Sequence, residues 1–242
     1  MTSAFPKTKL SAIQASRSED PAERRDAFEA IIAAYWKPVY KYVRMRWNRS
    51  SEDAQDLTQG FFTDVLAKHF FDRYDPAKAR FRTFLRTCLD AFIANQDKAA
   101  KRIKRGGDAR VLSVDFASAE RGLDSLVFTT TESPDHFFHQ EWVRTLFELA
   151  VQELQESCNT KGKAIYFKIF ERYDLESVED EDRITYDQLA AEFGITVTQV
   201  TNYLASARRE FRRLILDKLR RITTTVEEFR YEARALLGID LR

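Results

Sequence analysis

The side chains best suited to molecular recognition lie in a polar stretch near the C-terminus, between residues 185 and 204. Thr185 with Gln188, and Thr196 with Gln199, have the spacing of a capping box, in which two side chains satisfy backbone N–H groups at a helix start. Gly194 stands between the two boxes, where a turn requires a left-handed backbone. The pattern predicts two helices joined by a tight turn, as in helix-turn-helix proteins that place a helix on DNA.

The second of these helices has the chemistry of a DNA contact. Its start is polar and its continuation is basic, so the start could read base edges and the continuation could hold phosphates. We expect base contacts from Thr198, Gln199, Thr201, Asn202 and Tyr203, and phosphate contacts from Arg208, Arg209 and Arg212. The alternative is a helical hairpin in an all-α core. We favour DNA contact because the turn, the caps and the arginines agree.

A second basic face is expected earlier in the chain. Basic residues follow Asn95 at helical spacing: Lys98, Lys101, Arg102 and Arg105. No acidic residue lies in 98–107, so the like charges on this face would repel one another. A solvated charged face is the usual alternative. A phosphate backbone would relieve the repulsion, and the pattern therefore favours contact with nucleic acid.

Composition restricts the class of protein. The chain has 242 residues and a formal net charge of +1, so any basic surface must be local. Its 7 glycines and 5 prolines, with 32% charged residues, favour a mostly helical protein. No apolar run approaches the roughly 20 residues that span a bilayer, and residues 1–20 do not resemble a signal peptide. Cys88 and Cys158 lie far apart, so we expect no disulfide and a cytoplasmic protein without a membrane partner.

The helical patterns divide the chain into segments and predict an all-α fold of two helical domains joined by a linker. We expect an N-terminal extension (1–20), a first helical domain (21–107), a linker (108–134), a second domain with the helix-turn-helix (135–221) and a C-terminal helical extension (222–242). Pro38 should kink or break the first long helix. The amphipathic segment 226–237 should pack on the second domain.

Two apolar faces in the first domain are expected to form its core. A helix capped by Ser50 or Ser51 should turn Leu57, Phe61, Val65 and Leu66 inward. A later helix carries a continuous apolar stripe: Phe81, Phe84, Leu85, Cys88, Leu89 and Phe92.

Taken together, these segments resemble a bacterial RNA polymerase sigma factor of the extracytoplasmic-function group in the sigma-70 family. Residues 53–62 (DAQDLTQGFF) resemble the family's helix that docks on the largest polymerase subunit. Residues 81–105 resemble the helix that melts and reads the minus-ten promoter element, and residues 185–204 the module that reads the minus-thirty-five element. The docking string and the segment from Ala94 to Gly107 are similar to a subgroup with a C-terminal extension, some of whose members are linked to protein kinases.

The resemblance implies a function without bond chemistry and without a cofactor or metal. The chain would bind core RNA polymerase, direct it to promoter DNA and hold unpaired bases. The docking helix would contact polymerase through Asp53, Asp56, Gln59 and Phe62. Minus-ten DNA would meet the loop residues Arg73, Tyr74 and Lys78, then Asn95, Lys98, Lys101, Arg102 and Arg105. An anti-sigma factor or a Ser/Thr protein kinase would be a further partner.

Some residues depart from the family pattern. The docking helix has Gln55 and Gly60 where many relatives have an acid. A phosphate on Thr58 or Thr63 would add about −1.5 to −2 charges to this helix, so we expect these threonines to be phosphorylation sites that strengthen docking. In the helix-turn-helix, this chain has Thr201, Tyr203 and Ser206 where relatives often have Lys or Arg, which leaves the target sequence open.

Two other classes of function are possible. A conventional helix-turn-helix regulator would use the first domain for sensing or dimerisation, which requires a ligand pocket and no basic helical face. An enzyme would need a phosphate loop or a nucleophile with its base, and the sequence has neither motif. Asp135, His136 and His139 are expected to form a helix cap and surface, not a metal site.

Overall fold

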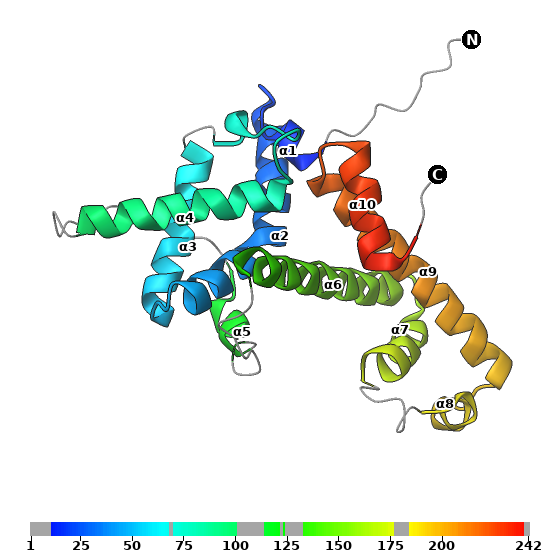
Figure 1. Ribbon diagram of the computed structural model, residues 1–242. Coiled ribbons are helices and arrows are strands. Elements are labelled where there is room, and N and C mark those ends of the chain that lie inside the picture. Colours follow the sequence, from blue (N-terminus) through cyan, green and yellow to red (C-terminus); the bar gives the residue numbers. More distant parts are fainter. Residues whose placement is uncertain are drawn as a thin grey trace, which may run out of the picture. The chain divides into compact units, whose positions relative to one another are not determined.

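In the computed structural model of the chain, every regular element among the described residues is a helix (Figure 1). The structure describes residues 11–67, 70–100, 114–121, 123, 133–176 and 184–239. The all-α class predicted from the sequence is therefore confirmed for these residues. No helix among them is long and apolar enough to cross a membrane.

The chain forms two compact units with boundaries other than those expected. The larger unit comprises Met1–Thr145 and Leu219–Arg242, and the smaller unit comprises Leu146–Lys218. The boundaries fall inside two long helices, α6 (Pro134–Thr160) and α9 (Val197–Ile222). The start of α6 and the C-terminal extension thus belong with the first helices of the chain.

The larger unit begins with α1 (Ala12–Ala15) and α2 (Pro21–Arg46). The Asp20 side chain accepts the backbone N–H of Ala22 and caps α2, and Pro21 occupies the first turn, where a missing N–H costs little. Pro38 does not break the helix, which continues through it and buries the proline ring in the core. The buried face of α2 includes Ile31 and Val39, both fully buried.

Helices α3 (Ser51–Ala67) and α4 (Phe81–Ala100) follow, with a short 3-10 helix at Phe70–Arg73 between them. Ser50 provides the expected cap, because its hydroxyl accepts the backbone N–H of Asp53 at 3.1 Å. The predicted stripe of α4 is largely confirmed: Phe81, Leu85 and Leu89 are buried, while Phe84, Cys88 and Phe92 are half-buried.

The buried face of α3 is wider than predicted, because α3 contacts both α2 and α4. Phe61 and Val65 are buried as expected, whereas Leu57 and Leu66 are only half-buried. The face also includes Ala54, Thr58 and Phe62. A helix packed on two sides buries residues that a single apolar stripe would leave outside.

The segment expected to be a linker contains a short helix, α5 (Phe116–Arg121), that packs on α2. The Phe116 ring meets Trp36 at 5.5 Å and Tyr40 at 5.1 Å between ring centroids. Glu120 accepts hydrogen bonds from Arg44 Nε at 3.1 Å and from the Tyr40 hydroxyl. This part of the expected linker is therefore anchored to the core of the larger unit.

The C-terminal helix α10 (Val226–Leu237) also packs within the larger unit, so the expectation that it packs on the second block is wrong. Glu232 is 1% exposed and pairs with Arg82 on α4, which is also buried. Phe81 is the first residue of α4, and its backbone N–H donates to the Glu228 carboxylate at 3.3 Å. The polar partners of α10 thus lie 147 and 150 residues away in the sequence, beyond the reach of any local pattern.

The smaller unit contains the end of α6, then α7 (Ala164–Phe170), a π-helical segment (Glu171–Leu175), α8 (Tyr186–Phe193) and most of α9. Its core includes Leu154, Ile169, Val200 and Ile215, all fully buried. This core holds α8 and the start of α9 in place.

Candidate nucleic-acid interface

The turn between α8 and α9 has the geometry that the sequence predicts. The backbone N–H of Thr185 donates to Gln188 Oε1 at 2.7 Å, and that of Gln188 donates back to Thr185 Oγ1 at 3.2 Å. Thr196 and Gln199 repeat the exchange at 2.9 and 3.2 Å. Gly194 has φ 64°, in the left-handed region. Two capping boxes and one glycine therefore fix where α8 ends and α9 begins.

Apolar contacts hold the two helices together beneath this turn. Leu189 on α8 and Val200 on α9 are fully buried, and Leu204 is 1% exposed. Ala190, 8% exposed, is small enough for a close approach, as expected. The opposite side of the first turns of α9 therefore faces solvent.

The polar residues expected to read bases lie on that exposed side, but they are not equally available. Thr198, Gln199, Thr201 and Asn202 are exposed. The carbonyl oxygen of the Gln199 side chain is engaged in the cap, and the Thr201 hydroxyl donates to the Val197 carbonyl at 3.1 Å. Thr198 and Asn202 form no such bond among the described residues. These two side chains are therefore the most available for a new partner.

Tyr203 has a different environment from its polar neighbours. It is half-buried, and its ring stacks on Tyr166 of α7 with 4.1 Å between centroids and 21° between planes. The Lys163 ammonium lies 5.4 Å from the centroid of Tyr166. The stack fixes the orientation of Tyr203 and occupies one face of its ring, so that face is not available for a base.

Arg208 does not fit the phosphate role expected for it. Its Nε and Nη2 atoms donate to the two carboxylate oxygens of Asp174 at 2.8 and 2.7 Å, and its guanidinium lies 5.3 Å from the centre of the Tyr173 ring. The hydrogen bond to Asp174 raises the pKa of Arg208 further above its already high value. A bidentate pair of this kind joins α9 to the π-helical segment and neutralises the cation.

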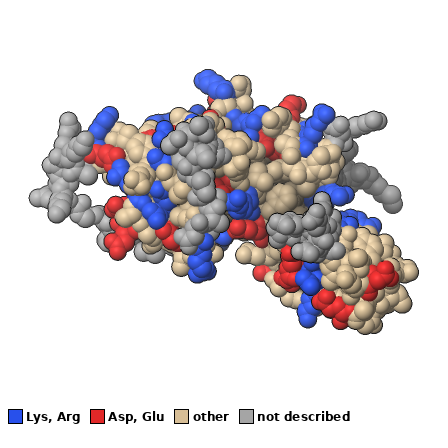
Figure 2. Space-filling view, turned by 60° about the horizontal axis from the view of Figure 1, so that its bottom comes forward, with Lys and Arg blue, Asp and Glu red and all other residues tan. Residues whose placement is uncertain are grey.

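Arg209 and Arg212, by contrast, are exposed and have no ion pair among the described residues. They lie on α9 downstream of Asn202. Such side chains can exchange solvent for phosphate without breaking an existing contact. On the face shown in Figure 2, basic and acidic side chains are interspersed, in keeping with the net charge of +1.

The basic face expected on α4 is only partly within the described residues. Asn95 and Lys98 are exposed, and Lys98 has no ion pair with a described residue. Lys101, Arg102 and Arg105 lie outside the described residues. Asp97 accepts two hydrogen bonds from Arg49 Nη2, each of 2.6 Å, and so does not neutralise Lys98.

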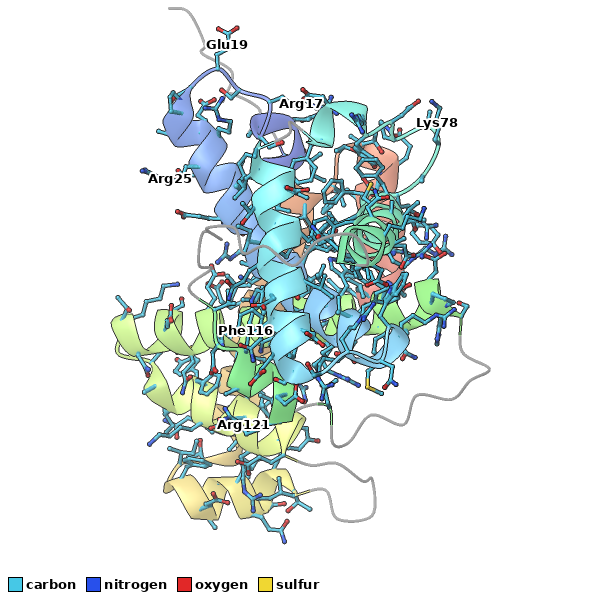
Figure 3. The ribbon with its side chains drawn as sticks, turned by 90° about the vertical axis from the view of Figure 1, so that its left-hand side faces the viewer. Arg17, Glu19, Arg25, Lys78, Phe116 and Arg121 are labelled. Atoms are coloured by element: carbon cyan, nitrogen blue, oxygen red, sulfur yellow. The ribbon has the colours of Figure 1, made fainter. Side chains whose placement is uncertain are left out.

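The loop before α4 places its three expected contact residues differently. Arg73 and Lys78 are exposed, and Lys78 extends outward from the loop in Figure 3. Tyr74 is 5% exposed and packs edge-on against Phe81, with ring centroids 5.2 Å apart. Tyr74 is therefore part of the core, and a role in holding a base from this position is wrong for the structure described. An aromatic residue in a loop can point either way, and nothing in the local sequence decides it.

The docking residues expected on α3 also differ in their exposure to solvent. Asp53 and Asp56 are exposed one turn apart, and Gln59 is half-buried. Phe62 is 1% exposed, so it serves the core and is not a surface contact. Only the acidic and amide side chains of the expected set can meet a partner directly.

The two threonines of α3 also differ. Thr58 is fully buried, which contradicts its expected phosphorylation because a kinase could not reach its hydroxyl in the folded chain. Thr63 is half-buried, and its hydroxyl donates to the Gln59 carbonyl at 2.9 Å. The expectation of a modified threonine therefore applies only to Thr63.

Gly60 lies at a tightly packed position on α3. A Cβ atom at this position would lie 3.3 Å from Cζ of Phe92 on α4. That contact is tight, so a larger residue would push against the helix that packs on α3. Close packing accounts for the glycine without reference to docking.

His136 and His139 lie in the first turns of α6, after Asp135. Asp135 accepts a hydrogen bond from Arg86 Nε at 2.6 Å. Among the described residues, no group of three or more His, Cys, Asp or Glu side chains could hold a metal ion. Burial lowers the pKa of His139 to about 4, so this side chain is neutral at physiological pH.

Comparisons of the chain with protein-family models, with curated proteins and with solved structures gave no match. The function is therefore inferred from the residues themselves and from their positions in the two units.

Proposed function

We propose that the chain is a sigma factor that binds core RNA polymerase and directs it to promoters. The observation that carries the proposal is the start of α9, which follows the capped helix α8, has its own capping box at Thr196 and Gln199, and presents an exposed polar face. Thr198 and Asn202 stand on this face without a side-chain hydrogen bond to any described residue, and Arg209 and Arg212 follow on the same helix. Asparagine can donate to and accept from adenine in the major groove, and arginine holds phosphates.

The second support is the acidic surface of α3. Asp53 and Asp56 are exposed on one face, and no ion pair within the described residues occupies either carboxylate. Their position after Ser50 follows the order of the sigma-like segments, with the docking helix preceding the minus-ten helix. Two unpaired carboxylates one turn apart suit a basic surface on a partner.

Co-purification with core polymerase tests the docking surface. Replacing Asp53 and Asp56 with lysine should abolish retention of the chain on polymerase, because both charges are reversed. Asp26→Lys with Glu29→Lys is the matched control, since these acids are also exposed and three residues apart, but on α2. In both double variants, each surface substitution should change the free energy of unfolding by no more than about 0.5 kcal/mol relative to the parent chain. Equal retention of the two variants would contradict the docking assignment.

Phosphorylation of Thr63 would be a means of regulating this docking. A phosphate at this half-buried position would add negative charge to α3 beyond Asp53 and Asp56. Thr63→Glu should raise the affinity for core polymerase, whereas Thr58→Glu should unfold the chain because Thr58 is fully buried. An unchanged polymerase affinity in a folded Thr63→Glu variant would remove this part of the proposal.

A further inference from the structure

A polar hollow of about 330 Å³ lies in the larger unit, where the starts of α4 and α6 meet α10. Its walls include Arg80, just before α4, Thr83 on α4, His136 on α6 and Tyr231 on α10. The hollow is open to solvent and large enough to admit a planar heterocycle. None of these residues belongs to the surfaces assigned above.

One wall of the hollow is a stack of two flat groups. The Arg80 guanidinium carbon lies 3.7 Å from the centroid of the Tyr231 ring. Tyr231 is 51% exposed, and the Arg80 side chain is 40% exposed, so both groups are accessible from solvent. A guanidinium on a phenol ring presents flat outer faces on which another planar group can continue the stack.

The charge around the hollow is nearly balanced. Arg82 pairs with Glu232, and its guanidinium lies 5.2 Å from the centre of the Trp142 ring. Asp135 pairs with Arg86 at 2.6 Å. Arg80 also lies 3.9 Å from Glu232. Because these charges are neutralised within the protein, the described lining of the hollow lacks the cluster of unpaired cations that would select a phosphate group.

The remaining polar groups suit a neutral ring with hydrogen-bonding edges. Thr83 supplies a hydroxyl that can donate or accept, and His136 adds an imidazole to the lining. Arg80 is 40% exposed and lies 3.9 Å from Glu232, so its outer side can still meet a phosphate attached to such a ring. Stacking on one wall and hydrogen bonds on another are how proteins hold unpaired bases.

We propose that this hollow binds a single unpaired nucleobase, stacked on Arg80 and Tyr231. The proposal rests on the proposed function, because an opened promoter supplies unpaired bases. It gives α10 a direct part in holding the separated strand. It also supplies the stacking surface that the buried Tyr74 cannot provide.

The test measures binding of the full chain, without polymerase, to a short single-stranded DNA containing one fluorescent base analogue. Tyr231→Ala should weaken binding roughly tenfold, as expected for loss of one base stack, while Tyr231→Phe should keep it. Val226→Ala is the matched control, because Val226 is 58% exposed on the same helix and outside the hollow. The same strand with an abasic site in place of the analogue should bind weakly and equally to all variants.

Several results would overturn the inference. One is that Tyr231→Ala, with unchanged thermal unfolding, binds the base-containing strand as tightly as the parent chain does. Another is that it weakens binding of the abasic strand to the same extent, since the effect would then not involve the base. Tighter binding of a free mononucleotide than of the strand would show that the ligand is a soluble nucleotide. Because polymerase is absent, these outcomes are distinct from a failure of polymerase docking or of transcription.

Discussion

Arg82 of α4 and Glu232 of α10 form a buried ion pair between residues 150 positions apart in the chain. The pair lies in the interior of the larger unit, where a charge without a partner is costly. Phe81 and Glu228 add a backbone-to-carboxylate hydrogen bond one turn away. The C-terminal helix is therefore an integral part of the unit that contains α2, α3 and α4.

Breaking this pair should destabilise the chain strongly. Glu232→Gln leaves Arg82 buried without a counter-charge, which costs about 3–5 kcal/mol in comparable buried pairs. Chemical denaturation measures the loss, with Glu227→Gln as the control because Glu227 is exposed on the same helix. Replacing both partners, Arg82→Met with Glu232→Leu, should recover much of the stability. A Glu232→Gln variant as stable as the control would show that the pair does not hold α10 in place.

Gly60 and Phe92 should be energetically coupled across α3 and α4. Alanine normally stabilises a helix interior by about 0.5–1 kcal/mol relative to glycine. Here the added Cβ would lie 3.3 Å from Phe92 Cζ, so Gly60→Ala should gain less than that or lose stability. In a Phe92→Leu background the same substitution should show its full gain. A double-mutant cycle measures this coupling. If Gly60→Ala changed the free energy of unfolding equally in the parent chain and in Phe92→Leu, the contact between Gly60 and Phe92 would not affect stability.

Local sequence signals predicted the parts of the fold that depend on neighbouring residues. The predictions of helix caps at Thr185 and Thr196 and of a left-handed Gly194 are confirmed. Each of these features involves residues at most three positions apart. Helical spacing also identified most of the buried stripe of α4. These features need no knowledge of the rest of the fold.

Long-range packing determined what the sequence could not show. Phe62 and Thr58 are buried because α3 has helices on two sides, and Tyr74 is buried because Phe81 lies beside it. The pairing of Arg208 with Asp174, 34 residues earlier, removes a cation that its local pattern placed on DNA. In each case the outcome depends on an element distant in the sequence, so residue type and spacing could not predict it.

Acidification should destabilise the larger unit through His139. Burial lowers the pKa of this imidazole from 6.5 to about 4 in the folded chain. Between these values the unfolded chain binds the proton and the folded chain does not, so the unfolding free energy falls as pH drops from about 6.5 towards about 4. His139→Gln should flatten this part of the stability profile. A profile of the same slope in the variant would assign the pH dependence to other groups.

Arg208 should contribute to stability, whereas Arg209 and Arg212 should contribute to DNA binding. Arg208→Ala removes a bidentate pair and should lower the midpoint of thermal unfolding, and Asp174→Asn should do the same. Arg209→Ala and Arg212→Ala should leave the midpoint of thermal unfolding unchanged. Each should also reduce the slope of log binding constant for promoter DNA against log salt concentration by about 0.9, because one phosphate contact is lost. A stable Arg208→Ala variant with the same flattened slope would place Arg208 on the phosphates instead.

The most direct test of the central claim is run-off transcription with core RNA polymerase from the organism that encodes the chain, on fragments of its own genome. Addition of the chain should produce transcripts from a defined set of start sites that core polymerase alone does not make. Asn202→Ala should change which of these promoters are used, with a difference of about 1–3 kcal/mol at a contacted base. No new transcript in the presence of the folded chain and active core polymerase would contradict the account. DNA binding by the chain under those conditions would instead indicate a conventional regulator.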